Sequence, residues 1–273
     1  SGAGKSTFVR LLSGAGRPDG GTFRFGGNPV DLAKYSVRKA RDMGIETVHQ
    51  DRCLCEGQSL WRNMFVGRHV RTRWGFIDIA AEREATRVML GEWLGLGGAG
   101  LDPDADVRVL SGGERQALAI GRAMYFGARL VILDEPTTAL DVTIQAQIFE
   151  LMQDLKNNND AAILLITHDM GVVAELADNV AVMYMGNIVE SGDARAVLTR
   201  SAHPYTRALL KSIPVLGRGK KQELEPIKGS TPDPYDRPKG CQFAPRCGYA
   251  TEQCMQEMPP ETEIGPGHFC RCF

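Results

Sequence analysis

Two apolar runs without alternation mark the interior of this chain. Leu130–Leu133 and Ala161–Ile166 are short and are bounded by turns or polar residues. Such runs are typical of strands buried on both faces of a sheet. Because helical patterns separate them, they predict an α/β fold with a mostly parallel sheet and crossover helices. Functional groups are then expected beyond the carboxyl ends of the strands.

Shorter patterns predict the elements of the front half. Residues 22–30 alternate between polar and apolar and turn at two glycines, as a hairpin does. An amphipathic helix is expected from about Asp31 to Met43, ending at Gly44, with a strand at 45–50.

The remaining patterns complete the expected organisation. Residues 78–94 predict a helix with an acidic start and a glycine after its end. Residues 214–240 are rich in Pro, Gly and charge, which indicates a linker. We expect four parts: 1–50, the first part of a truncated P-loop core; 51–125, a helical subdomain; 126–200, the second part of the core; and 201–273, the linker and a C-terminal extension.

Composition narrows the classes of function. The 273 residues are 43% hydrophobic and carry a net charge of −1, with acids and bases interspersed. This balance argues against a broad basic face for nucleic acid. The longest apolar stretches are far shorter than the ~20 residues that span a bilayer, so any membrane link is expected through partners.

The first residues match the end of a phosphate-binding loop. The pattern G-x-x-x-x-G-K-[ST] ends at Gly4-Lys5-Ser6, and its first glycine falls two positions before Ser1. Glycines let backbone N–H groups face a polyphosphate at a helix N-terminus, Lys5 adds a cation, and the Ser6 hydroxyl suits Mg²⁺. The alternative is a glycine-rich turn before an ordinary helix.

Asp134 and Glu135 follow the apolar strand 130–133, where an uncompensated carboxylate is costly. Asp134 suits the coordination shell of Mg²⁺, and Glu135 suits a general base that polarises water for attack on a γ-phosphate. The alternative is a strand end that emerges into solvent.

The stretch LSGGE at 110–114 offers a second anion site. Ser111 and Glu114 form a capping box, so the modest interpretation is a well-started helix. Capping does not need Gly112 and Gly113, whose N–H groups are exposed at the positive helix terminus.

In this order, the motifs resemble those of the ATP-binding subunits of ABC transporters. SGAGKST is similar to Walker A, TVHQD to the Q-loop, LSGGE to the signature motif, VILDEP to Walker B, TALD to the D-loop and ITHD to the switch histidine. The resemblance implies a P-loop NTPase with ATP and Mg²⁺ as cofactors. It implies ATP contacts at Ser1, Gly2, Ala3, Gly4, Lys5, Ser6, Thr7, Ser111, Gly112, Gly113, Glu114 and Asp141; Mg²⁺ contacts at Ser6, Gln50 and Asp134; and catalytic roles for Glu135, His168 and Gln50.

The resemblance also implies an assembly. Two ATP-binding subunits, identical or different, would close head-to-tail on ATP beneath transmembrane permease subunits, as a peripheral complex at the cytoplasmic face of the membrane. Two departures matter: Glu114 replaces the commoner glutamine, and the segment before Ser1 would carry the strand and the adenine-stacking aromatic of the family. We therefore expect weak ATP binding by the chain as it stands, tightened by the upstream residues.

The tail indicates which class of substrate is transported. HPYTRALLKSIP at 203–214 and the cysteine-containing stretches after it resemble the C-terminal extension of oligopeptide and dipeptide importer ATPases, whereas residues 31–50 and 61–68 are closer to sugar-importer ATPases. Peptide import is favoured. A sugar importer, a soluble ABC-type ATPase acting on nucleic acid or ribosomes, and an inactive fragment remain alternatives.

Cys241, Cys247 and Cys254 are separated by five and six residues, and Cys270 and Cys272 lie near the end. Disulfides do not suit the reducing cytosol, and zinc pairs are usually more closely spaced. Four thiolates suit a 4Fe-4S iron–sulfur cluster, with zinc or unliganded thiols as alternatives. The peptide-importer resemblance implies Cys272 as the fourth ligand and leaves Cys270 open.

Overall fold

The computed structural model of the protein describes residues 3–49, 54–95, 101–136, 142–158, 161–212, 227–233 and 235–273. The chain forms two compact units. One is Val9–Ile166; the other combines the first residues, up to Phe8, with Thr167–Phe273. Helix α1 (Lys5–Leu12) begins in the second of these units and ends in the first.

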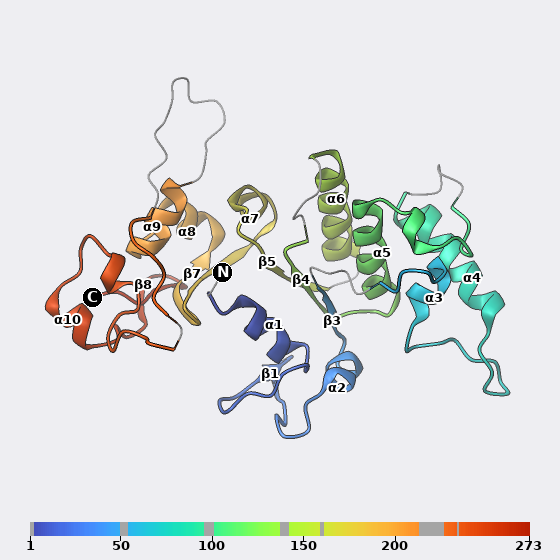
Figure 1. The fold of residues 1–273 in the computed structure, drawn as a ribbon, viewed down its shortest axis with the longest axis horizontal. Coiled ribbons are helices and arrows are strands. Elements are labelled where there is room, and N and C mark those ends of the chain that lie inside the picture. Colours follow the sequence, from blue (N-terminus) through green and yellow to red (C-terminus); the bar gives the residue numbers. More distant parts are fainter. Residues whose placement is uncertain are drawn as a thin grey trace. The chain divides into compact units, whose positions relative to one another are not determined.

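The unit Val9–Ile166 contains the expected parallel sheet, in the order β3 (Ile45–Val48), β4 (Leu130–Asp134) and β5 (Ala162–Ile166) (Figure 1). The middle of β4 has no exposed surface, which confirms that the apolar run forms a buried strand. At the carboxyl ends, Asp134 lies opposite Ile166.

The hairpin predicted at 22–30 is confirmed by β1 (Arg24–Phe25) and β2 (Asn28–Pro29), which pair antiparallel. Helix α2 (Val37–Asp42) starts six residues later than expected. The Asp31 carboxylate instead accepts the N–H of Ala33 in a local turn, and the Ser36 side chain caps the helix at the later position.

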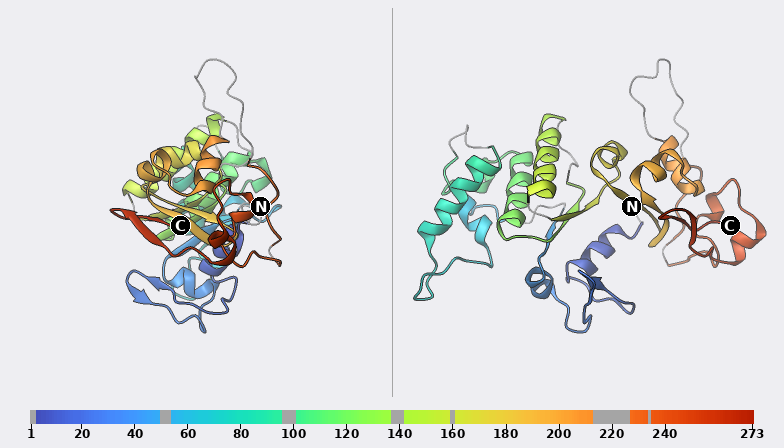
Figure 2. Two further views of the ribbon diagram at one scale, coloured as in Figure 1. Left: turned by 90° about the vertical axis from the view of Figure 1, so that its left-hand side faces the viewer. Right: turned by 180° about the vertical axis from the view of Figure 1, so that it is seen from behind.

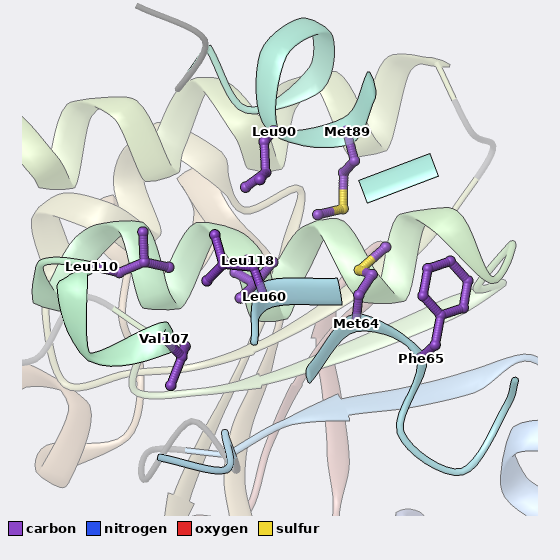
Figure 3. Close-up of a cluster of buried hydrophobic side chains, with 8 residues drawn as sticks. All are labelled: Leu60, Met64, Phe65, Met89, Leu90, Val107, Leu110 and Leu118. Atoms are coloured by element: carbon purple, nitrogen blue, oxygen red, sulfur yellow. The ribbon is translucent and has the colours of Figure 1, made fainter. Parts of the chain in front are cut away.

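The helical part of this unit packs around its own apolar core. The eight side chains drawn in Figure 3 come from several elements and are at most 3% exposed. The predicted helix over 78–94 is confirmed as α4 (Ile79–Val88), which continues into a π-helical turn. The other elements are α3 (Leu60–Phe65), the π turn Met89–Trp93, the 3₁₀ turn Val107–Val109, α5 (Gly112–Tyr125) and α6 (Val142–Asn158).

The other unit carries an antiparallel sheet, in the order β6-β7-β9-β8, that the apolar pattern did not predict. The last strands belong to the tail, which is coloured red in Figure 2. Its elements are α7 (Met170–Leu176), β6 (Asn179–Tyr184), β7 (Asn187–Asp193), α8 (Ala194–Thr199), α9 (Pro204–Lys211), the 3₁₀ turn Ala244–Arg246, α10 (Glu252–Gln256), β8 (Thr262–Gly265) and β9 (His268–Cys270).

The described residues of the expected linker, 227–233 and 235–240, contain no helix or strand. Of the helices in the described ranges, none combines the length and apolar character that a bilayer-spanning segment needs.

Candidate functional site

The phosphate-loop residues lead directly into α1. Gly4 has φ +92°, and a Cβ atom there would lie 2.9 Å from the Cα of Gly186, so only glycine fits. The Gly186 N–H donates to the carbonyl of Ala3 at 2.8 Å. Lys5, Ser6 and Thr7 then form the first turn of α1, and the N-terminus of a helix favours an anion. Ser1 and Gly2 lie outside the described residues.

The two predicted acids lie at the carboxyl edge of the parallel sheet. Asp134 is the last residue of β4, and the N–H of Glu135 donates to the carbonyl of Ile166 at 2.8 Å. Both acids are half-buried. Glu135 has φ +50°, an unusual value for a residue with a side chain, and such strained backbone is frequent at functional sites.

The start of α5 forms both halves of the capping box. The Ser111 hydroxyl accepts the N–H of Glu114, and the Glu114 carboxylate accepts the N–H of Ser111 at 2.6 Å. The negative charge that replaces the commoner glutamine is therefore directed back onto its own helix terminus. The capping box uses the N–H groups of Ser111 and Glu114 and does not use those of Gly112 and Gly113.

Gly113 has a second reason to be glycine, which the sequence did not reveal. A Cβ atom there would lie 1.8 Å from Cγ2 of Ile144 in α6. The missing side chain thus lets α5 and α6 pack closely.

His168 follows β5 by two residues and is exposed. The hydroxyl of Thr167 accepts the N–H of Asp169, whose carboxylate caps α7 by accepting the N–H groups of Gly171 and Val172. The imidazole is therefore held at a short, capped turn. The predicted residues Gln50 and Asp141 lie outside the described part of the chain.

The predicted site residues are divided between the two units. The acidic pair and the start of α5 belong to Val9–Ile166, whereas Ala3–Thr7 and His168 belong to the other unit. Each unit by itself therefore offers a helix N-terminus suited to an anion, and the unit Val9–Ile166 also carries the acidic pair at the edge of its parallel sheet.

Four of the tail cysteines lie near one another. Burial raises the pKa of the Cys272 thiol, and the thiols of Cys241, Cys247 and Cys254 raise it further. The N–H of Cys241 donates to the carbonyl of Cys254 at 2.8 Å, and any side chain on Gly240 would collide with that carbonyl. Close backbone contact thus brings two of these cysteines together.

Cys270 behaves differently from Cys272. Burial raises the pKa of the Cys270 thiol to about 12, and the next largest influence is the carboxylate of Glu190. Cys241, Cys247 and Cys254 do not contribute to this shift. Cys272 therefore lies near the other three cysteines, whereas Cys270 lies near Glu190 and Cys272. Within the described ranges, no group of three or more His, Cys, Asp or Glu residues is arranged to hold a metal ion.

Glu190 is a buried carboxylate that sequence reasoning missed. It accepts the N–H groups of Ala202 and His203 at 2.7 and 3.0 Å, and the ring of His268 contacts it at 2.9 Å. It thereby joins β7 to the start of α9 and to β9. The only signal in the sequence is an acid that directly follows the apolar pair Ile188-Val189.

Comparisons with known proteins agree with this arrangement. Residues 1–138 match the ABC transporter family, and residues 189–254 match the oligopeptide/dipeptide transporter C-terminal region. A Brucella ovis protein named for peptide import and ATP binding is 38% identical over all of this chain and 85% of its own length. The oligopeptide transport ATP-binding protein AppD of Bacillus subtilis is 50% identical over 60% of this chain and 50% of its own.

The solved structure of cbiO1 from Clostridium perfringens, part of the ABC transporter complex cbiONQ, covers 74% of this chain and 77% of its own, with a TM-score of 0.60 at 25% identity. The fold, the motif order and these similarities agree. The chain belongs to the ABC transporter family of ATP-binding proteins.

Proposed function

We propose that this protein is the ATP-binding and ATP-hydrolysing subunit of an ABC importer of peptides. The observation that carries the substrate class is the tail, because residues 189–254 match the C-terminal region of oligopeptide/dipeptide transporters. The names of the Brucella and Bacillus relatives support the same class. A sugar importer is the alternative that the front half of the sequence favours.

The chain's own residues suit ATP and Mg²⁺. The N-terminus of α1, with Lys5 and the preceding backbone from Ser1 to Gly4, would hold the phosphates. Mg²⁺ prefers oxygen ligands, which Ser6, Gln50 and Asp134 supply, and it would neutralise phosphate charge when bound. Thr7 and Asp141 complete the proposed nucleotide contacts.

Glu135 is the proposed general base. A half-buried carboxylate at the sheet edge can accept a proton from water as that water attacks the γ-phosphate. His168 would donate a hydrogen bond to the γ-phosphate from its turn before α7. Ser111 to Glu114 would approach ATP held by a second ATP-binding subunit, so hydrolysis would require a dimer with two identical contacts.

Transmembrane permease subunits would complete the importer, and the protein would then lie at the cytoplasmic face of the membrane. Closure of the dimer on ATP and its release after hydrolysis would drive the permease, because ATP favours the closed state through contacts made only there. Gln50 would sense the metal or water next to the permease.

The experiment compares three variants in ATP binding and hydrolysis. Glu135→Gln should lower hydrolysis by about 10²- to 10⁴-fold while ATP still binds, because an amide cannot take the proton. Lys5→Ala should weaken binding as well. Glu150→Gln, an exposed acid on α6, is the matched control and should behave as the unchanged protein. Hydrolysis by Glu135→Gln at the rate of this control would contradict the proposed role.

Substrate class is tested in cells. Loss of the gene should abolish uptake of labelled oligopeptides and leave sugar uptake intact. The reverse pattern would favour the sugar-importer alternative.

We propose in addition that Cys241, Cys247, Cys254 and Cys272 hold an iron–sulfur cluster that staples the tail. The backbone contact of Cys241 with Cys254 and the influence of the Cys241, Cys247 and Cys254 thiols on Cys272 support this set, although the described side chains are not themselves arranged to hold a metal ion. Each iron of a 4Fe-4S cluster takes one thiolate, so a cluster needs the four cysteines around a shared volume. When bound, it would supply cross-links to a tail that has few apolar residues.

Anaerobic purification tests the cluster. The protein should be brown, with iron and sulfide in equal amounts, and Cys272→Ser should lose the colour. Cys270→Ser is the matched control and should keep it. A colourless protein that contains zinc or no metal would refute the proposal.

A further inference from the structure

The segment between α3 and α4 forms a hairpin with a fixed shape. The N–H of Thr72 donates to the carbonyl of Phe76 at 2.8 Å, and Arg71 pairs with Ile77 across the hairpin. Gly75 has φ +84° at the turn. In two views, this turquoise segment extends away from the helices it joins (Figures 1 and 2).

The base of the hairpin is anchored by a buried acid. Glu82 has no exposed surface, and its carboxylate accepts the N–H of Val70 at 2.7 Å and contacts the His69 ring at 3.1 Å. The N–H of Asp78 donates to the carbonyl of Val70 at 2.8 Å. These contacts hold the Arg71–Ile77 hairpin in a defined orientation on α4.

Folding does not explain the side chains at the tip. Trp74 and Phe76 are 73% and 74% exposed, although each could stabilise the fold if it were buried. Val66, Ile77 and Ile79 extend the apolar surface, with between 42% and 47% of each exposed. Exposed apolar side chains concentrated on one short segment are typical of a binding surface.

The charges around this surface are positive. The exposed Arg71 donates to the carbonyl of Gly75, and the exposed Arg73 stacks over the Trp74 ring at 4.7 Å. Arg62 donates to the amide oxygen of Gln58. None of these three arginines has a carboxylate within salt-bridge distance among the described residues. Three neighbouring acids are engaged elsewhere: Asp78 caps α4, Glu82 is buried, and Asp104, which Arg62 influences, is paired with Arg83.

We propose that the Arg71–Ile77 hairpin binds the headgroup region of an anionic lipid bilayer. Tryptophan and other aromatic rings favour the boundary between water and acyl chains, and arginines are attracted to acidic headgroups. Trp74 and Phe76 lie on the projecting tip, which suits insertion into a flat, deformable surface. Arg62, Arg71 and Arg73 then face the phosphates.

A protein partner is the competing occupant. A cavity of about 390 Å³ beside the hairpin is lined by Trp61, Val66, His69 and Ile77, among others, and it would accept an apolar side chain. Trp74 and Phe76 do not line this cavity. The two most exposed rings therefore need a different explanation from the cavity, and the bilayer supplies one.

The test is cosedimentation of the purified full chain with vesicles, which needs neither ATP nor permease and so is independent of the proposed transport function. The protein should bind vesicles of equal phosphatidylglycerol and phosphatidylcholine, and bind pure phosphatidylcholine much less. Arg71→Gln with Arg73→Gln should weaken binding on the order of 30-fold. Trp74→Ser with Phe76→Ser should weaken it about tenfold or more.

Matched controls distinguish binding by the hairpin from nonspecific binding through any exposed arginine or aromatic ring. Arg195→Gln with Arg200→Gln removes two exposed arginines elsewhere, and Tyr249→Ser removes a ring that is 76% exposed; both should bind as the unchanged protein does. Circular dichroism checks that the variants fold. Fluorescence of the unchanged protein should be quenched by brominated acyl chains, and Trp74→Phe should lose this quenching while it keeps binding.

Two outcomes overturn the proposal. One is equal binding of the unchanged protein and the arginine variant to the anionic vesicles. The other is no vesicle binding at all, together with loss of permease association in Trp74→Ser with Phe76→Ser, which would assign the hairpin to a protein partner.

Discussion

The imidazole of His203 is buried at the start of α9, with 1% of the residue exposed. Its Nδ1 accepts the N–H of Tyr205 at 3.0 Å and so caps the helix, which requires the neutral ring. Burial lowers the pKa of His203 to about 4, against a smaller opposing effect of the Glu190 carboxylate. Protonation therefore works against the folded state.

This residue predicts a pH dependence of stability. The folded pKa is below the unfolded value of 6.5, so the contribution is fully present above pH 6.5 and is lost as the pH falls through about 4. It amounts to about 3 kcal/mol in the free energy of unfolding. His203→Asn keeps a capping oxygen that does not titrate. Urea titrations at several pH values should show a flatter dependence in this variant, and an unchanged slope would contradict the assignment.

Single residues also show what the sequence could predict. Glycine, lysine and acidic positions with strict chemical requirements, such as Gly4 and Glu135, were predicted from local spacing, and the unusual backbone of both residues is consistent with a special role. The cap of His203 and the buried Glu190 were not, because both depend on contacts between strands and helices that are distant along the chain. Burial of a polar side chain leaves no local pattern.

At the scale of elements, the contact of α5 with α6 depends on one missing side chain. The Cβ of an alanine at position 113 would lie 1.8 Å from Cγ2, 3.1 Å from Cβ and 3.3 Å from Cγ1 of Ile144. Rotation of Ile144 cannot remove all three contacts, because Cβ does not move with the rotamer. The two helices would have to separate.

Gly113→Ala should therefore destabilise the protein by about 1–3 kcal/mol, the usual cost of overpacking. Gly91→Ala is the matched control, since a Cβ there meets no atom within 4 Å, and it should be neutral or stabilising by up to about 1 kcal/mol. Adding Ile144→Ala to Gly113→Ala should recover part of the loss in a double-mutant cycle. Equal stability of the two glycine variants in urea would disprove the steric argument.

Strands and turns were predicted better than helix starts and tail strands. The strands β4 and β5 are marked by their own apolar runs, and the end of α2 is marked by the glycine that closely follows it. A short stretch of sequence is therefore enough to predict them. Helix α2 starts late because Ser36 competes with Asp31 for the role of cap. The short strand β9 pairs with β7, about 80 residues earlier, and β8 in turn pairs with β9. No alternation over three or four residues reveals that pairing.

At the scale of the whole molecule, the first described residues group with the C-terminal half of the chain. The bond from Gly186 to Ala3 and the close approach of Gly4 join the proposed phosphate loop to the turn between β6 and β7. That turn contains Met185 and Gly186, both with positive φ. The turn thus holds the proposed phosphate loop in place, although it lies about 180 residues later in the sequence.

Gly186→Ala should weaken ATP binding. Its φ of +85° costs a side-chain residue about 1–2 kcal/mol, although the new Cβ meets no neighbour. If relief of this strain moves the turn, calorimetry should show affinity lower by about 5- to 30-fold. Gly127→Ala carries comparable strain, at φ +64°, in the other unit and should leave affinity unchanged. An equal loss of affinity in both variants would show that the turn has no special link to the loop.

The same bond constrains the order of events during synthesis. A ribosome that adds about 5–20 residues per second needs about 10 to 40 s to extend the chain from Ala3 to Gly186. The Val9–Ile166 unit can begin to fold within that time, because all of its residues are made before Gly186. The proposed phosphate loop cannot form its contact with Gly186 until Gly186 has been synthesised. Any nucleotide contact that relies on Gly186 can form only after the sheet with the two acids has been made, so a nascent chain acquires its proposed base before its phosphate cradle.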